Sequence, residues 1–378
     1  MRVLILPVLL FLSFFLTTAS SLKAQDLFEQ TVVWKQNENG IFTYFVYGLV
    51  ATRKGTILAF AEARIDEGGD DGPHHIVMKR SLDGGRSFLE SRIIIKSEGG
   101  QECWANPTPV EDSQTGTIFL FYALNDRNIS SRIFYIKSND EGLSWSDPFE
   151  LVLSSMINAH NWTFHLPGPG HGIQLKNQRL IIPVWHRKAI SFSSGERNYG
   201  VNCLYSDDHG KTWMSGEPTP VGELNESQLV EQPNGDLLLL GRTIHSKSNS
   251  YLAKIVSKDG GLSWNGEIKY DEALKGAVCD IGMLRYSFKP NRILISQPSN
   301  IKKRLDLVVR LSNDGGKSWR RSALIQSGAA TYSDLALLPD KTIICLFGHG
   351  GTAYAPESVS LVRFNLNWLK RTTDRNKL

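Results

Sequence analysis

The chain has 378 residues, of which 41% are hydrophobic and 21% charged, and its formal net charge at pH 7 is +4. This composition is typical of a globular protein, and so small a charge does not favour nucleic acid as a partner. After the first two dozen residues, no stretch has the roughly 20 predominantly apolar residues that a membrane-spanning helix needs. We therefore expect neither a nucleic-acid partner nor a membrane span.

Residues 1–24 have the pattern of an export signal. Arg2 supplies a positive start, residues 3–16 are almost wholly apolar, and Ala24 ends the segment with a small residue suited to cleavage. We expect cleavage after Ala24 and a secreted or periplasmic mature protein over residues 25–378.

An octapeptide of the form S-x-D-x-G-x-[ST]-[WF] occurs five times. In each copy the Asp can accept N–H groups of a turn and the Gly can adopt a positive φ, so each copy predicts a tight turn between two strands. The starts are 51 to 68 residues apart, which leaves room for four short strands, and such a period favours a β-propeller. The copies begin at Ser81, Ser138, Ser206, Ser257 and Ser312.

Apolar and β-branched runs recur along the chain and predict strands. They cover residues 55–60, 116–122, 179–184, 235–240 and 341–346. Residues 329–369 contain no octapeptide but can form a sixth sheet, closed by a strand over residues 30–35 from the other end of the chain. The predicted fold class is all-β, a six-bladed β-propeller that forms one domain over residues 25–378.

The cysteines and histidines give no metal motif. The four cysteines lie far apart without a Cys-x-x-Cys pair, and we expect buried free thiols at Cys103, Cys203, Cys279 and Cys345. Six histidines could face the propeller axis, but their spacing matches no ligand motif, so we interpret them as loop or structural residues. These are His74, His75, His160, His165, His171 and His186. No metal and no cofactor is expected.

The octapeptides resemble the Asp boxes of sialidases, and the resemblance covers nearly all of residues 25–378. In those families the boxes lie on the outer edge of the blades, so we interpret their Asp and Trp residues as structural. Further segments resemble sialidase site segments in the family's order. They are residues 60–64 with 69–72, 106–110, 168–175, 225–228 with 241–242, Arg304, and 332–335. The chain is identified as a member of the sialidase (neuraminidase) superfamily, similar to bacterial exo-α-sialidases with Asp-box (BNR) repeats.

This resemblance implies three catalytic residues. Tyr332 would be the nucleophile, because a neutral tyrosine avoids the repulsion between a sialoside carboxylate and an anionic nucleophile, and Glu226 would be its general base. Asp70 would protonate the leaving oxygen and later activate water, with Asp71 as the alternative acid. Read singly, Tyr332 could be a packing residue, Glu226 could cap a turn, and Asp70 could form an Asp-Gly turn.

The resemblance also implies that arginines bind the substrate. Arg242 and Arg304 would hold its carboxylate through planar, charge-assisted hydrogen bonds, and Arg64 is included with them. Read singly, Arg304 could be an ordinary solvated charge. Five of these residues are expected to converge on one concave face, with the Tyr332 hydroxyl near the Glu226 carboxylate and the five octapeptides at the periphery; they are Asp70, Glu226, Arg242, Arg304 and Tyr332.

Two positions depart from the family pattern. Phe45 stands where sialidases have the Arg of a Tyr-Arg-Ile-Pro run, and Gly348 stands where they have a Glu that orients this Arg. Since both members of an ion pair are absent together, we expect a remodelled pocket, with Phe45 and Gly348 as neighbours and a wall that is more apolar and less cationic.

Three functions follow from these observations. The first is a secreted, exo-acting retaining glycoside hydrolase that removes terminal sialic acid or a related ulosonic acid from glycans. The second is a sialidase-fold hydrolase or lyase that acts on another sugar of an extracellular polysaccharide, which the changes at Phe45 and Gly348 favour. The third is a non-catalytic carbohydrate-binding propeller, which has no need of a nucleophile. In each case the partner is a glycan or polysaccharide; linkage and oligomeric state leave no sequence signal.

Overall fold

The computed structural model of this chain describes residues 25–67, 69–152, 162–188, 199–244 and 251–375. Nearly all regular structure in them is β-strand, as the all-β prediction requires. The expected export signal, residues 1–24, and His160 lie outside the described residues. Within the described ranges, no helix is long and apolar enough to cross a membrane.

The strands form four hydrogen-bonded sheets. The largest has the order β2-β3-β4-β6-β7-β8-β9, with β5 added beside β4. Its strands are β2 (Thr43–Ala51), β3 (Ile57–Arg64), β4 (His74–Ser81), β5 (Arg92–Ile95), β6 (Cys103–Glu111), β7 (Ile118–Asp126), β8 (Ser130–Ser138) and β9 (Phe149–Leu151). Short 3-10 turns flank this sheet at η1 (Glu38–Gly40), η2 (Gly69–Asp71) and η3 (Glu98–Gly100).

The remaining sheets follow in chain order. The second contains β10 (Phe164–Pro167), β11 (Ile173–Gln174), β12 (Leu180–Arg187), β13 (Gly200–Ser206) and β14 (Met214–Ser215). The third contains β15 (Leu224–Glu231), β16 (Leu237–Thr243), β17 (Tyr251–Ser257) and β18 (Asn265–Lys275). The fourth contains β19 (Gly282–Ser287), β20 (Arg292–Pro298), β21 (Leu305–Ser312), β22 (Arg321–Leu337), β23 (Ile343–His349), β24 (Ser358–Phe364) and β1 (Phe28–Lys35), and helix α3 (Leu366–Arg375) follows β24.

Two of the sheets join two groups of strands. In the largest, a single parallel pair, His74 with Cys103, links β4 to β6. In the fourth, the long strand β22 pairs with β21 through residues 321–329 and with β23 through residues 330–337. The described strands therefore form four sheets rather than six separate ones, and the count of six blades stays a prediction.

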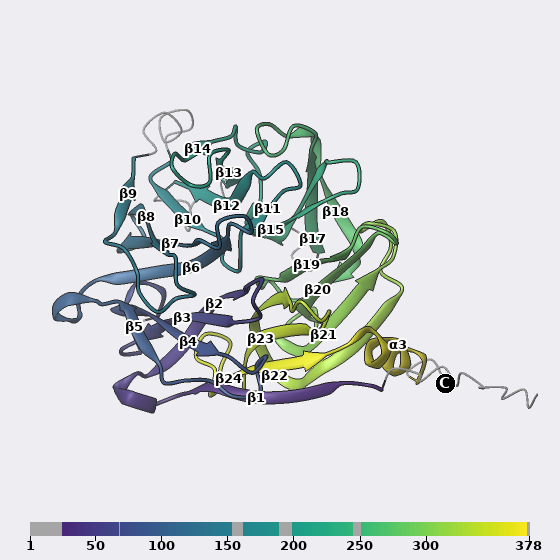
Figure 1. Cartoon of the computed structure of the whole chain (residues 1–378), viewed down its shortest axis with the longest axis horizontal. Coiled ribbons are helices and arrows are strands. Elements are labelled where there is room, and N and C mark those ends of the chain that lie inside the picture. Colours follow the sequence, from purple (N-terminus) through teal and green to yellow (C-terminus); the bar gives the residue numbers. More distant parts are fainter. Residues whose placement is uncertain (1–24, 68, 153–161, 189–198, 245–250, 376–378) are drawn as a thin grey trace, which may run out of the picture.

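The sheets follow one another around the molecule (Figure 1), and strands far apart in sequence meet towards its middle. Strand β2 contacts β6 and β22, β6 contacts β10, β15 contacts β12 and β19, and β19 contacts β22. Two of the hydrophobic cores lie between neighbouring sheets, and a third lies between strands of the fourth sheet. This arrangement brings residues from all four sheets to one place.

Two local predictions are confirmed by the strand pairing. Strand β1 pairs antiparallel with β24, so the expected strand at residues 30–35 joins the sheet at the other end of the chain. The five apolar runs lie in β3, β7, β12, β16 and β23. Each octapeptide forms the turn that follows β4, β8, β13, β17 or β21.

The octapeptide turns share one hydrogen-bond pattern, which the copy at Ser138 shows. The Ser138 hydroxyl accepts the N–H of Gly142 at 2.8 Å and donates to Asp140 at 2.8 Å. Asp140 also accepts the N–H of Ser144 at 2.9 Å. Because every bond closes within five residues, this turn is determined locally, whatever the surrounding fold.

All four cysteines are buried free thiols, which confirms the expectation for Cys103, Cys203, Cys279 and Cys345.

Candidate active site

One cavity is lined by residues from all four sheets, and it brings together the six residues singled out in the sequence. Arg64 ends β3, Asp70 lies on η2, Glu226 and Arg242 lie on β15 and β16, Arg304 precedes β21, and Tyr332 lies on β22; all six line the cavity. No octapeptide residue lines it.

Irregularities in strand pairing direct several side chains into this cavity. The register of β2 shifts between Phe45 and Tyr47, that of β6 between Ala105 and Thr108, that of β15 between Leu224 and Ser227, and that of β22 between Ala330 and Ser333. An extra residue in a strand breaks the alternation of faces and redirects the side chains beside it. Each shift lies next to residues that line the cavity, which are Phe45, Val46, Ala105, Asn106, Asn225, Glu226 and Tyr332.

Two of these positions hold unusual backbone conformations. Val46 has a φ of 49° and Asn106 a φ of 57°. A positive φ is uncommon outside glycine and is costly for a β-branched residue such as valine, and such strain gathers at functional sites. The surrounding sheets therefore hold the cavity wall in a shape that the local sequence alone does not prefer.

Tyr332, Glu226 and Arg242 form a compact hydrogen-bonded group. The Tyr332 hydroxyl lies 2.8 Å from both carboxylate oxygens of Glu226. Arg242 Nη1 donates to Glu226 and to the Tyr332 oxygen, both at 2.6 Å. Burial raises the pKa of Tyr332 well above its ordinary value, and Arg242 offsets only part of this effect. The phenol is therefore protonated at neutral pH, with a carboxylate in contact with its proton.

Arg304 lies between two tyrosine rings. Its guanidinium carbon is 5.1 Å from the ring centroid of Tyr332 and 4.8 Å from that of Tyr354. It also donates to two backbone carbonyls, from Nε to Val278 at 3.2 Å and from Nη1 to Ala353 at 2.9 Å. These contacts fix the plane of the guanidinium at the cavity wall and hold the loop that carries Tyr354.

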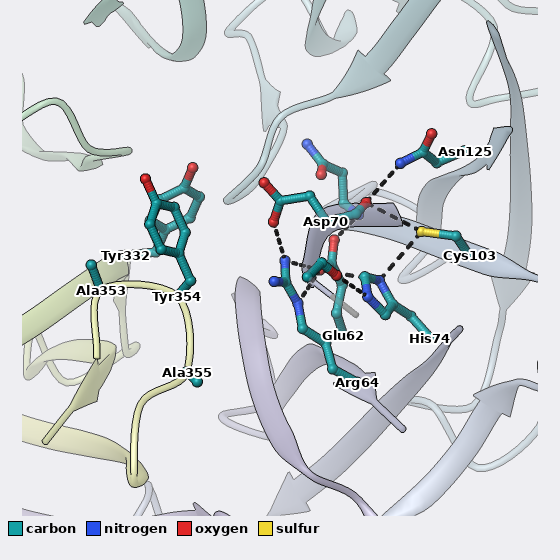
Figure 2. A network of polar contacts seen from close by, with 12 residues as sticks. Glu62, Arg64, Asp70, His74, Cys103, Asn125, Tyr332, Ala353, Tyr354 and Ala355 are labelled. Atoms are coloured by element: carbon teal, nitrogen blue, oxygen red, sulfur yellow. Dashed lines mark hydrogen bonds and ion pairs between the residues drawn. The ribbon is translucent and has the colours of Figure 1, made fainter. Parts of the chain in front are cut away.

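Across the opening from Tyr332 and Tyr354, Asp70 pairs with Arg64 (Figure 2), at 2.8 Å between Oδ1 and Nη2. The Asp70 side chain is 64% exposed. The side chain reaches solvent, yet its partial desolvation at the cavity would by itself raise the pKa of Asp70; the charge and hydrogen bond of Arg64 outweigh this effect and keep the pKa below its ordinary value. Asp71 lines a different hollow, so only Asp70 of this pair faces the cavity.

Arg64 also pairs with Glu62, to which the same Nη2 donates at 3.0 Å. Burial raises the pKa of Glu62 to about 7, against the opposing effects of Arg64 and the N–H of Asn106. The guanidinium of Arg64 also lies 4.7 Å above the Phe45 ring. Arg64 is thus paired with two carboxylates of the protein, whereas the family resemblance implies that it binds the substrate.

Phe45 fills the cavity wall beside Tyr332. The two ring centroids are 4.8 Å apart, and Tyr47 packs edge-on against Phe45 at 6.2 Å. A Cβ built on Gly348 would lie 2.2 Å from the Tyr47 hydroxyl oxygen and 2.6 Å from that of Thr331. Among the side chains of β2, that of Tyr47 is therefore the nearest to Gly348. Because Tyr47 also packs against Phe45, it links the two positions that depart from the family pattern.

Several lining residues had not been singled out by the sequence reasoning. Glu62, Asn106 and Asn225 lie inside segments that resemble those of the family, so those segments hold a signal for them. Tyr354 and Trp185 also line the cavity, and nothing in the sequence distinguishes them from ordinary aromatic residues. Only the fold places them there.

The described histidines have protein partners rather than a common centre. His74 Nε2 lies 2.8 Å from the Gly69 carbonyl oxygen, His171 Nδ1 lies 2.7 Å from Asp334, and His165 Nδ1 lies 2.5 Å from His186. No group of three His, Cys, Asp or Glu side chains in the described part of the chain could hold a metal ion.

Comparison with known proteins gives a consistent family. The profile of the BNR repeat-like domain matches residues 55–345. The sialidase of Micromonospora viridifaciens is 28% identical over 369 residues, covering 91% of this chain and 55% of its own. Human sialidase-4 is 30% identical over 263 residues, covering 62% of this chain and 52% of its own. The chain thus spans little more than half the length of these relatives.

Solved structures agree on the fold. The Hadza microbial sialidase Hz136 superimposes with a TM-score of 0.77 at 22% identity, over 90% of this chain and 69% of its own. The intramolecular trans-sialidase from Ruminococcus gnavus superimposes with a TM-score of 0.75 at 18% identity, over 90% of this chain and 98% of its own.

Proposed function

This chain belongs to the BNR repeat-like family within the sialidase superfamily, and from that premise we propose that it is an exo-acting retaining glycoside hydrolase. Its substrate would be a glycan that ends in sialic acid or a related ulosonic acid. The observation that carries this proposal is the contact of the Tyr332 hydroxyl with the Glu226 carboxylate at 2.8 Å inside the cavity.

In the proposed first step, the Tyr332 oxygen attacks the anomeric carbon while Glu226 takes the phenolic proton. The raised pKa of Tyr332 means that the phenol does not ionise by itself, so a base in direct contact is needed. Arg242 donates to the same oxygen and stabilises the negative charge that grows on it. A glycosyl-tyrosine intermediate forms, and water then hydrolyses it with retention of configuration.

Asp70 would supply the proton to the leaving oxygen and afterwards activate the water. Because Arg64 keeps the pKa of Asp70 low, Asp70 is ionised at neutral pH as it stands. A general acid needs its protonated form, so we infer an acidic working pH or a loosening of the Arg64 pair when a substrate enters. The exposure of the Asp70 side chain agrees with a group that meets both the leaving group and water.

Arg242 and Arg304 would hold the substrate carboxylate. Arg242 Nε has no hydrogen-bond partner among the described residues, and the contacts of Arg304 use its Nε and Nη1. With Phe45 in place of a third arginine, the carboxylate would have two cationic partners. The apolar wall that Phe45 forms favours one alternative, a sialidase-fold enzyme that acts on another acidic or neutral sugar of a polysaccharide.

Two further proposals concern the whole chain. We infer that residues 1–24 direct export, which N-terminal sequencing of the secreted or periplasmic protein would test by finding Gln25 first. We also infer six blades, since strand grouping around the single parallel pair and the two halves of β22 divides the four sheets into six sets. An experimental structure with five or seven sets would contradict this count.

The test of the enzyme proposal is Tyr332→Phe, assayed on aryl α-sialosides. We expect turnover to fall at least about a thousand-fold, while calorimetry shows affinity for the free sugar acid within about threefold, because only the nucleophilic oxygen is lost. Tyr135→Phe, which removes a phenolic oxygen outside the cavity, is the matched control. Retained turnover in Tyr332→Phe would refute the nucleophile. Turnover of a neutral aryl glycoside that is insensitive to Arg242→Ala would favour the alternative.

A further inference from the structure

Close to Asp70, the cavity wall contains a second carboxyl group that the steps proposed above do not use. Glu62 lies on β3 and lines the cavity, and its side chain is 2% exposed, whereas that of Asp70 is 64% exposed. Both carboxyl groups contact the same nitrogen atom (Figure 2), Nη2 of Arg64, at 3.0 Å from Glu62 and 2.8 Å from Asp70. One guanidinium group therefore serves two acids, one buried and one open to solvent.

The positive charge in this cluster is sufficient for only one of the two acids. Within the described part of the chain, Arg64 is the only permanent cation at ion-pair distance from Glu62. The His74 ring lies 3.6 Å from Glu62, but burial lowers the pKa of His74 to about 3, so the ring is neutral. Two carboxylates beside one guanidinium leave one negative charge unbalanced, which is costly at a buried position. The cluster is therefore balanced when it holds one proton.

The other titratable groups around these acids do not change their charge at neutral pH. Burial raises the pKa of the Tyr47 phenol on β2 and that of the Cys103 thiol on β6, so both groups stay protonated. Arg242 on β16 lowers the pKa of Asp70 as well, and it stays positively charged. The number of protons in the cluster therefore depends on Glu62 and Asp70 alone.

In the free protein, the buried member of the pair is the one that holds the proton. Burial raises the pKa of Glu62 to about 7, while the exposed and ion-paired Asp70 has a pKa below its ordinary value. Oε2 of Glu62 faces Nδ1 of His74 at 3.6 Å. This nitrogen is an acceptor, because Nε2 of the neutral ring must donate to the Gly69 carbonyl oxygen, 2.8 Å away. A proton on Oε2 thus faces an acceptor rather than a second donor.

A bound substrate reverses the preference of the two acids. The leaving group has to approach Asp70 and cover it, which removes the solvent that stabilises its negative charge and favours its protonated form. Arg64 can then pair fully with Glu62, to which its Nε also donates at 3.3 Å. Glu62 loses a proton as Asp70 gains one, so the cluster keeps the same number of protons and the same total charge.

We propose that Glu62 and Asp70 share one proton across Arg64, and that Glu62 is the positioning residue that lets Asp70 hold this proton when the substrate is bound. The inference rests on the proposed function, because it explains how an ionised Asp70 becomes the acid of the first step. Asp70 then passes the proton to the leaving oxygen as the glycosidic bond breaks. Both carboxylates share Arg64 until Asp70 takes a proton from the attacking water.

The experiment compares Glu62→Gln with the wild-type protein on two α-sialosides, one that releases methanol and one that releases 4-nitrophenol. Glutamine has the shape of protonated Glu62, keeps an acceptor for the Asn106 N–H that Oε1 binds at 3.0 Å, and cannot ionise. Arg64 therefore stays with Asp70, and we expect the alkaline limb of kcat/KM to move by about one pH unit to lower pH. At pH 7, kcat/KM should fall about tenfold for the methyl sialoside and less than about threefold for the nitrophenyl sialoside, whose leaving group needs little protonation.

Two further variants separate this role from a purely structural one. Glu62→Asp keeps a carboxyl group and should return the limb part of the way to its wild-type position. Glu150→Gln, which removes a surface carboxylate paired with Arg132 at 3.1 Å, is the matched control and should not move the limb. A loss of rate in Glu62→Gln that is equal at every pH and for both leaving groups would overturn the inference, because it would show that Glu62 only supports the fold.

A second measurement follows the proton without turnover. In protein labelled with carbon-13 at the glutamate carboxyl groups, the signal that is missing from Glu62→Gln belongs to Glu62, and its chemical shift reports the titration. The midpoint should be near pH 7 in the wild-type protein and should fall by about one pH unit in Asp70→Asn, where Glu62 no longer competes for Arg64. Asp71→Asn, whose side chain lines a different hollow, is the control. If Glu62→Gln fails to fold, Glu62→Asp identifies the signal and the titration decides.

Failure of this inference can be told apart from failure of the enzyme proposal. If Tyr332→Phe abolishes turnover but the Glu62 midpoint is the same in Asp70→Asn as in the wild-type protein, the enzyme stands and the shared proton is refuted. If neither sialoside is cleaved, the titration alone decides. A midpoint that falls in Asp70→Asn and not in Asp71→Asn would then support the shared proton without the enzyme, and an unchanged midpoint would overturn it.

Discussion

At the residue scale, the pairing of Arg64 with Asp70 controls the protonation of the proposed acid. Two other ionisable groups lie near Arg64, and burial changes the pKa of both. It raises the pKa of Glu62 to about 7 and lowers that of His74 to about 3. His74 is thus neutral at the pH values of interest, and Arg64 is the cation that sets the charge of the cluster. Asp70 is accordingly more acidic than an isolated carboxyl group.

We expect Arg64→Met to move the alkaline limb of the pH–rate profile to higher pH. Activity requires protonated Asp70 and is lost as the pH rises through its pKa, and this pKa rises when Arg64, the strongest of the influences that lower it, is removed. The measurement is kcat/KM against pH. Arg132→Met, which removes a surface cation paired with Glu150 at 3.1 Å, serves as the control. An unmoved limb with reduced activity would assign Arg64 to binding alone.

At the scale of elements, the contact between β2 and β23 depends on the absence of a side chain at Gly348. Its backbone φ is not positive, so alanine meets no conformational strain there, but the added Cβ would collide with the Tyr47 and Thr331 hydroxyls. We expect Gly348→Ala to lower the free energy of unfolding by about 1–3 kcal/mol through overpacking. In a Tyr47→Phe background the cost should be smaller, because the closest oxygen is gone.

Urea denaturation of the two single variants and the double variant measures this coupling. Gly222→Ala is the matched control, since a Cβ there makes only ordinary contacts, the nearest at 3.4 Å to Ile268. Strictly additive effects at Tyr47 and Gly348 would contradict the contact.

The octapeptide turns predict an acid dependence of stability. Hydrogen bonds from the side chain and N–H of Ser144 lower the pKa of Asp140 to about 2. Burial acts in the opposite direction, but its effect is smaller. A lowered carboxyl pKa contributes stability that is complete above the unfolded-state pKa of about 3.9 and is lost as the pH falls through about 2. We expect Asp140→Asn to cost on the order of 1 kcal/mol at pH 6.

This cost should shrink between pH 4 and pH 2, as protonation weakens the same bonds in the wild-type protein. Guanidinium denaturation at several pH values measures it, with Asp147→Asn, an exposed neighbour outside the octapeptide, as the control. A difference that stays constant down to pH 2 would show that the Asp140 charge does not contribute.

At the scale of the whole molecule, β1 connects the two ends of the described chain. Trp34 on this strand is fully buried, stacks on Tyr44 at 5.6 Å and donates from its indole nitrogen to Ser91 at 3.0 Å. It therefore ties the last sheet, which β1 completes, to β2 of the first sheet. The stability of the whole molecule should therefore depend on this one side chain.

We expect Trp34→Ala to lower the free energy of unfolding by about 3–5 kcal/mol, the usual cost of a large cavity. Val32→Ala, on the same strand but 46% exposed, should change it by less than about 1 kcal/mol. Chemical denaturation followed by tryptophan fluorescence and by circular dichroism measures both. Equal effects of the two substitutions would mean that β1 is an accessory strand.

The sequence by itself determined whatever depends on short-range chemistry. The octapeptide turns close within five residues, and the apolar runs form strands wherever they occur, so all-β structure and the strand from residues 30–35 could be predicted. The order of the segments was enough to predict that Arg64, Asp70 and Tyr332 belong to the site. It did not predict the contacts that each side chain makes.

Only the tertiary structure decided those contacts, because they join residues that are distant along the chain or turned by an irregular strand. It placed Asp70 rather than Asp71 at the cavity, tied Arg64 to two carboxylates, and filled the space at Gly348 with the hydroxyl of Tyr47. It also left the Asn225 amide buried without a partner. Burial and hydrogen-bond satisfaction are properties of the packed molecule, and no local pattern in the sequence records them.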